Sequence, residues 1–167
     1  MSKDIAAWAF IEHAVLSSAE RDGSLRDHAQ CVEEKYDLPP GYLKTGLIWQ
    51  TRALSLLYML ILFPKEYWKL NRGDPIYRDI EQRWSVVDAV SVVTPDKRYG
   101  STAYGFVHRL RNALAHASIT FQGDNIEIWD TSGRQEVYRA KIGRKEAENF
   151  LAVVGSTMAN LRSRAVH

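Results

Sequence analysis

The sequence predicts a mainly α protein, a helical bundle with a small antiparallel β meander inserted before its last helix. Several long stretches repeat apolar residues every three or four positions, which is the period of a helix with one buried face. One stretch, residues 119–142, instead alternates apolar and polar residues as strands do. The 167 residues can bury a sizeable core, so we expect a single domain over residues 1–167.

Two long helices and a short one are expected in the first part of the chain: 4–21, 42–63 and, between them, 25–35. Gly23 follows the first helix, the segment DLPPG at 37–41 forms a turn, and Pro64 ends the second long helix. Residues 53–63 are apolar almost all round. A helix of that kind lies at the centre of a bundle or is covered by a partner.

The next part of the chain offers less regular signals. Residues 65–79 are aromatic and charged, and the segment NRGDP at 71–75 is a turn. Residues 84–93, WSVVDAVSVV, are rich in β-branched side chains, which favour strands. Their valines also recur at helical spacing, and we expect a third long helix there. Residues 94–100 then form a loop.

After residue 117 the period of the apolar residues changes to two. The alternating apolar positions are Ile119, Phe121, Ile126, Ile128, Tyr138, Ala140 and Ile142. The segments QGDN at 122–125 and TSG at 131–133 are turn signals, so this part predicts the antiparallel meander. A last helix is expected over residues 144–162.

Residues 104–117, YGFVHRLRNALAHA, are the helix around which we expect the function to be organised. At about 100° per residue its core face consists of Phe106, Leu110, Ala113, Leu114 and Ala117. His108, Asn112 and His116 follow one another at intervals of four and form a polar stripe away from that face. Arg109 and Arg111 flank this stripe on its two sides.

A polar stripe can be an ordinary solvated helix face, but the residue types here favour a site. Asn is a mediocre helix former, and Lys, Glu or Gln would serve solubility better than two histidines. An imidazole titrates near neutral pH, and a guanidinium matches the oxygens of a phosphate. Lys97 and Arg98 precede the helix start, where free amides also favour an anion. This pair fits phosphate contact and a solvated loop equally well.

The segment RNALAH, from Arg111 to His116, resembles the Arg-Asn-x-x-x-His motif of the HEPN superfamily (higher eukaryotes and prokaryotes nucleotide-binding). The resemblance implies an HEPN-like up-and-down helical bundle and a metal-independent endoribonuclease of toxin or defence type. It assigns acid–base chemistry to His116 and phosphate contact to Arg111, with Asn112 beside them. The products would carry a 2′,3′-cyclic phosphate and a 5′-hydroxyl.

HEPN domains commonly pair with their motifs facing each other, so the resemblance also implies a homodimer with a composite site. The substrate would be RNA, and a nucleotidyltransferase-like protein is a candidate antitoxin. Further candidates for contact with the substrate are His108, Arg109, Lys97 and Arg98. Two alternatives remain open: a non-catalytic HEPN module for RNA binding, nucleotide binding or dimerisation, and a plain helical scaffold in which the motif is a coincidence.

Charge, cysteine content and motifs argue against several other classes of function. A formal charge of +2 does not by itself indicate a nucleic-acid binder, although a local basic patch is compatible with it. Cys31 is the single cysteine, which excludes an internal disulfide and a cysteine-based zinc site. Neither a metal-ligand spacing nor a Gly-rich phosphate loop is present, so we expect no metal and no cofactor. The start of the chain lacks a signal-peptide pattern and residues 53–63 are too short to cross a bilayer, so we expect a cytoplasmic protein without membrane contact.

Overall fold

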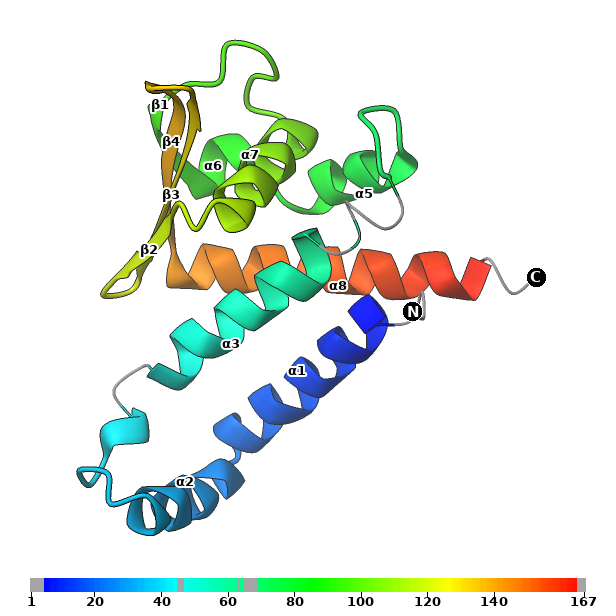
Figure 1. The fold of residues 1–167 in the computed structure, drawn as a ribbon. Helices are drawn as coiled ribbons and strands as arrows, with labels where there is room; N and C mark the ends of the chain where they lie inside the picture. Colours follow the sequence, from blue (N-terminus) through cyan, green and yellow to red (C-terminus); the bar gives the residue numbers. More distant parts are fainter. Residues whose placement is uncertain (1–4, 45–46, 63, 65–68, 165–167) are drawn as a thin grey trace.

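The computed structural model describes residues 5–44, 47–62, 64 and 69–164 (Figure 1). Its helices are α1 (Ile5–Arg21), α2 (Ser24–Lys35), α3 (Leu47–Leu57), α5 (Pro75–Arg83), α6 (Val86–Ala89), α7 (Ala103–Ala115) and α8 (Arg144–Arg164), with a 3-10 turn η1 (Tyr42–Lys44) and a π turn η2 (Tyr58–Leu62). Its strands are β1 (Val90–Thr94), β2 (Ile119–Gln122), β3 (Asn125–Ser132) and β4 (Gln135–Gly143). The mainly α prediction is confirmed.

Helices α1 and α8 lie where the apolar period predicts them, and α2 lies where the short helix was expected. The expected helix over residues 42–63 is divided. It begins as the turn η1, continues as α3 and ends in η2. Residues 4 and 63, two of the predicted helix boundaries, lie outside the described residues. The turn at 71–75 is present, with the backbone N–H of Asp74 donating to the carbonyl of Asn71 (3.1 Å). None of the helices in the described ranges is long and apolar enough to span a bilayer.

The expectation of a helix over residues 84–93 is wrong for its second half. Ser85 caps the single helical turn α6, its Oγ accepting from the backbone N–H of Asp88 (3.3 Å). From Val90 the chain is a strand, β1, which pairs antiparallel with β4. The β-branched composition prevails here because the free edge of β4 supplies the backbone hydrogen bonds that a lone helix turn would lack. Helix α5, which the sequence pattern did not predict, begins at Pro75, the last residue of the turn at 71–75.

The strands form an antiparallel sheet in the order β1-β4-β3-β2. Ile128 of β3 pairs with Ile119 on one side and with Ala140 on the other, so the alternating apolar residues share one face. That face is buried toward α7 and α8, and the sheet stands beside α7 in Figure 1. β2 follows the motif helix α7 almost at once, and β3 packs against that helix.

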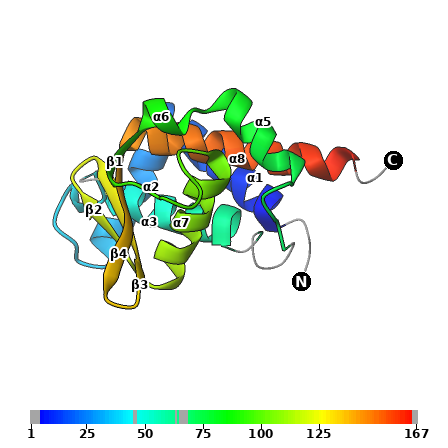
Figure 2. The same cartoon turned by 90° about the horizontal axis from the view of Figure 1, so that it is seen from above.

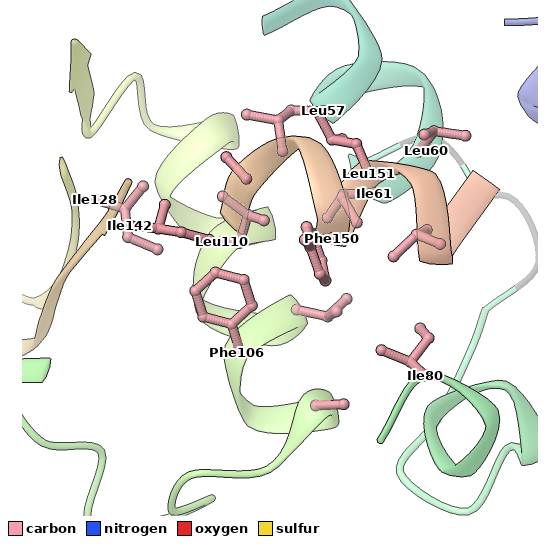
Figure 3. Packing of buried hydrophobic residues seen from close by; sticks show 14 of the residues in the cluster. Leu57, Leu60, Ile61, Ile80, Phe106, Leu110, Ile128, Ile142, Phe150 and Leu151 are labelled. Carbon is pink, nitrogen blue, oxygen red and sulfur yellow. The ribbon is translucent and has the colours of Figure 1, made fainter. Parts of the chain in front are cut away.

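A continuous hydrophobic core joins these elements (Figure 3). Phe106 of α7 meets Phe150 of α8 with ring centroids 5.2 Å apart, and Trp84 lies 4.7 Å from the same ring. On the far side of α8, Gly155 faces the ring of Phe10, and a Cβ at that position would overlap the ring. Seen from above, α8 runs behind α7 with α1 below it (Figure 2). The core therefore packs against α7 on several sides, and the polar stripe of this helix is not part of the core.

Candidate active site

Helix α7 carries the motif, and its first turn is closed by groups of the chain itself. Thr102 is the N-cap, and its Oγ1 accepts a hydrogen bond from the backbone N–H of Gly105 (3.0 Å). The backbone N–H of Ala103 donates to Oε1 of Glu81 on α5 (2.8 Å). These acceptors satisfy amides that were expected to be open to a phosphate. An internal carboxylate already interacts with the positive end of the helix.

Lys97 and Arg98 are exposed in the loop before α7. Asp96, just before them, contacts Arg109 at the middle of the helix. His116 lies seven residues beyond Arg109, about 10 Å along the helix axis. Lys97 and Arg98 therefore belong to a loop that contacts the middle of α7 through Asp96, and their contact with a substrate stays a prediction.

The last turn of α7 and its C-cap hold the motif. His116 is the C-cap, and its backbone N–H donates to the carbonyl of Asn112 (3.0 Å). Ala117 adopts the left-handed conformation, with φ of 53°, and the backbone N–H of Ser118 donates to the carbonyl of Ala113 (2.7 Å). This is the Schellman type of helix ending. The helix thus ends two residues before residue 117, and Ala117 is exposed rather than on the core face.

The three motif side chains lie at this end of the helix with different exposure. His116 is exposed, whereas Arg111 and Asn112 are partly buried. Nη1 of Arg111 donates to Oδ1 of Asn112 (3.0 Å). The hydroxyl of Tyr58 donates to the carbonyl of Leu114 (3.0 Å), which ties η2 to the same turn. Arg111 and Asn112 thus contact each other, and His116 follows them at the exposed C-cap of the same helix. That the three side chains act as one site stays a prediction.

Arg109 occupies a different environment from Arg111, two positions away. Its side chain is 12% exposed and lies between two carboxylates that are almost fully buried, Asp96 (1%) and Asp130 (6%). Nε and Nη2 of Arg109 donate to the two oxygens of Asp96 (2.7 and 3.2 Å), and Nη1 donates to Oδ2 of Asp130 (2.7 Å). In this structure Arg109 is an internal ion-pair partner that joins α7 to β3 and to the loop after β1, not an exposed phosphate ligand.

The ionisation of these groups reflects this arrangement. Burial by itself raises the pKa of Asp96, but hydrogen bonds from Arg109 and from two backbone N–H groups of its own loop outweigh burial and lower the pKa below its usual value. Hydrogen bonds to Asp96, and then to Asp130, raise the pKa of Arg109. Burial, with the nearby charge of Asp96, raises the pKa of Tyr138 to about 12. The Asp96–Arg109 pair is therefore ionised at any physiological pH.

His108 lies one helical turn before Asn112, packed against two tyrosine rings. Its centroid is 4.8 Å from that of Tyr99 in an edge-on contact and 5.9 Å from that of Tyr104 in a stacked one. The side chain is partly exposed. It is adjacent to the motif, as predicted, but sits within an aromatic cluster.

Asp96 and Asp130, the two carboxylates that complete this region, were not predicted from the sequence. A signal for Asp130 was present in the alternation of the meander, because Asp130 follows Ile126 and Ile128 at the same spacing of two. A charged residue at a position that faces the core must find a partner. No comparable signal marks Asp96, whose contact with Arg109 depends on the path of a loop.

Comparison with known proteins agrees with the motif. Residues 31–163 match the protein family described as HEPN pEK499 p136, a range that includes all of α7, the sheet and most of α8. Neither a curated protein nor a solved structure shows significant similarity to the chain.

Proposed function

Because the chain belongs to the HEPN family pEK499 p136, as the motif predicted, we propose that it is a metal-independent endoribonuclease of toxin or defence type. Its site would consist of Arg111, Asn112 and His116 from each of two subunits. The proposal rests on the presence of a hydrogen-bonded arginine and an exposed histidine at the same end of one helix. Arg111 is bonded to Asn112 (3.0 Å), and His116 is open to solvent at the same end of α7.

The chemistry needs only groups that this site provides. His116 as a base takes the proton of a ribose 2′-hydroxyl, whose oxygen attacks the adjacent phosphorus. The bond from phosphorus to the 5′-oxygen breaks, which leaves a 2′,3′-cyclic phosphate and a 5′-hydroxyl. Arg111 stabilises the negative charge that develops on the phosphate oxygens. The departing 5′-oxygen must receive a proton, and the imidazole of His116 in a second copy would donate it.

An exposed apolar surface on α1 is compatible with the pairing of two copies. Trp8 is 49% and Val15 62% exposed. A groove of about 340 Å³ lies between α1 and α3 and is lined in part by Trp8 and Met59. A second copy that covers this apolar surface would form the symmetric dimer that the proposed composite site requires.

A non-catalytic RNA- or nucleotide-binding module is the second candidate. His108, the other imidazole of the stripe, is packed against Tyr99 and Tyr104, so within the described ranges His116 is the exposed imidazole that one chain offers at the motif. A chain that stayed monomeric would lack the second proton-transfer group and would bind without cleaving. A nucleotidyltransferase-like antitoxin is a proposed partner for the toxin.

The test is cleavage of RNA by the purified protein in excess chelator, with analysis of the product ends. His116→Ala is compared with His28→Ala, which removes an exposed imidazole from α2, far from the motif in the chain. Cyclic-phosphate ends that disappear in His116→Ala and persist in His28→Ala would support the proposal. Cleavage that survives His116→Ala would overturn it, and a folded dimer that binds RNA without cutting it would favour the second candidate.

A further inference from the structure

Asp130 of β3 bonds to the motif as well as to Arg109. Its Oδ2 accepts a hydrogen bond from Nη1 of Arg109 (2.7 Å) and another from Nδ2 of Asn112 (2.9 Å). The carboxylate is 6% exposed, so water does not replace either donor. A residue of the β meander therefore forms part of the surroundings of the motif helix.

Asn112 stands between a group that can only accept hydrogen bonds and a group that can only donate them. The carboxylate of Asp130 accepts, the guanidinium of Arg111 donates, and the amide of Asn112 has one side for each. With Nδ2 toward Asp130, Oδ1 faces Nη1 of Arg111 at 3.0 Å. Turning the amide over would set its NH₂ group against the guanidinium. Asp130 therefore fixes which way the amide points, and the amide in turn holds Arg111.

Arg109 and Asp96 stabilise the carboxylate of Asp130, which orients the amide of Asn112. An isolated buried carboxylate is costly and would take up a proton, whereas one paired with a guanidinium stays ionised. Arg109 supplies that pairing, and its two hydrogen bonds to Asp96 keep its own position fixed. The order of contacts thus runs from the buried Asp96 through Arg109, Asp130 and Asn112 to Arg111 at the surface.

We propose that Asp130 is a positioning residue that orients Arg111 through the amide of Asn112, and that the β meander is thereby a component of the active site. The inference deepens the proposed ribonuclease function and rests on it for its catalytic consequence. It gives the inserted sheet a role beyond covering the core. The positioning itself is a statement about side-chain geometry, which can be measured without any cleavage.

The test compares Asp130→Ala with the conservative variant Asp130→Asn. Asp130→Ala removes the oxygen that accepts from both Arg109 and Asn112, so nothing at position 130 orients the Asn112 amide. In Asp130→Asn the carbonyl oxygen of the new amide can take the place of Oδ2 and accept from both donors, so the orientation of Asn112 is kept although the charge is lost. Both variants lose the charge that faces Arg109, so both should be less stable than the wild type.

The matched control is Glu127→Gln, which removes another buried carboxylate from the same strand. Glu127 pairs with Arg139 (3.2 Å) and Lys141 (3.7 Å) on the opposite face of β3 and contacts no motif residue among those that the structure describes. A loss of stability without any effect on the motif is expected for this variant. It separates a change in the sheet from a change in the orientation of Arg111.

Two readouts are taken: the NMR resonance of the Arg111 Nε–Hε group, and kcat and KM for RNA. We expect Asp130→Ala to shift the resonance and lower kcat by about 10- to 100-fold with little change in KM, because the misplaced guanidinium stabilises the transition state less well. Asp130→Asn should keep the resonance and most of kcat although its stability is also reduced. Glu127→Gln should leave both readouts unchanged.

Each result decides the inference. An Arg111 resonance and a kcat that Asp130→Ala leaves unchanged would overturn it, as would an equal loss of kcat in Asp130→Ala and Asp130→Asn. If the wild-type protein cleaves no RNA, the proposed function fails and the resonance alone decides whether Asp130 positions Arg111. The failure of one proposal can therefore be distinguished from the failure of the other.

Discussion

The two halves of helix α7 contain similar polar residues but offer them to different partners. In the first half, Ala103 donates to Glu81 and Arg109 bonds to Asp96 and Asp130, all within the chain. In the second half, His116 is exposed after a turn that ends the helix. An arginine side chain or a helix N-terminus thus indicates an anion-binding site only when no carboxylate of the same chain already binds it.

The contrast is sharpest between Arg109 and Arg111, which are two residues apart. About 200° of helix rotation separates them, so one faces β3 while the other reaches the motif from its far side. Substitution at each should therefore affect a different property of the protein. The larger loss of stability is expected at Arg109, and the larger loss of cleavage at Arg111.

Replacing Arg109 with alanine should destabilise the fold by about 3–5 kcal/mol, because two buried carboxylates lose their common partner. Urea unfolding of Arg109→Ala beside the wild type measures this effect. Arg98→Ala is the control, since Arg98 is exposed and its loss should change the free energy of unfolding by less than about 0.5 kcal/mol. A small effect at Arg109 would mean that Asp96 and Asp130 find other partners or water, and the two arginines would then differ less than the geometry indicates.

Replacing Arg111 with alanine should lower cleavage by about 10²- to 10³-fold, the usual cost of losing one group that stabilises transition-state charge. The free energy of unfolding should change little, because the side chain is only partly buried. The measurement is kcat together with urea unfolding. Arg134→Ala, at the exposed turn between β3 and β4, is the control for the loss of a positive charge. Unfolding of Arg111→Ala would show instead that Arg111 is structural.

Acid should weaken the Asp96–Arg109 pair. Because the pKa of Asp96 in the folded protein lies below its usual value of 3.8, its contribution to stability is fully present above that value. The contribution is lost as the pH falls through 3.8 toward the lower folded pKa. The free energy of unfolding of the wild type should therefore decrease on acidification more steeply than that of Asp96→Asn, followed by urea titrations at several pH values. Parallel curves for the two proteins would argue against the depressed pKa.

The sequence predicted the parts of this structure that depend on local patterns. Unbroken helical spacing predicted the motif helix. The alternation of apolar and polar residues predicted that Ile126, Ile128, Tyr138 and Ala140 share one face of the meander. Arg111 and Asn112 lie near the end of α7 and His116 at its C-cap, because the motif spans only six residues. That they form one site stays a prediction. The family match over residues 31–163 agrees with the motif from which the resemblance was inferred.

The features that escaped prediction depend on contacts distant in the chain. Val90 starts a strand only because β4, some 50 residues later, offers it an edge. Arg109 appeared to be a flanking cation because its partners come from a loop and from β3, and no spacing within α7 reveals them. Helical periodicity also could not show that the helix would end at Ala115, since the ending depends on the left-handed conformation of Ala117.

The C-terminal end of α7 gives the prediction with the smallest expected effect on the comparison between the two halves of this helix. At the left-handed position a glycine avoids the steric cost of a Cβ, so Ala117→Gly should stabilise the protein by about 1 kcal/mol. The control is Ala115→Gly, at the exposed last residue of the helix, which should instead destabilise the protein because glycine is a poor helix former. Urea unfolding of both variants compares the signs directly. Cleavage by Ala117→Gly should equal that of the wild type, because the hydrogen bond from Ser118 to Ala113 already fixes the turn (2.7 Å). A loss of cleavage in the more stable protein would mean that the strained alanine itself places His116, and the exposed half of α7 would then be as tightly constrained as the buried half.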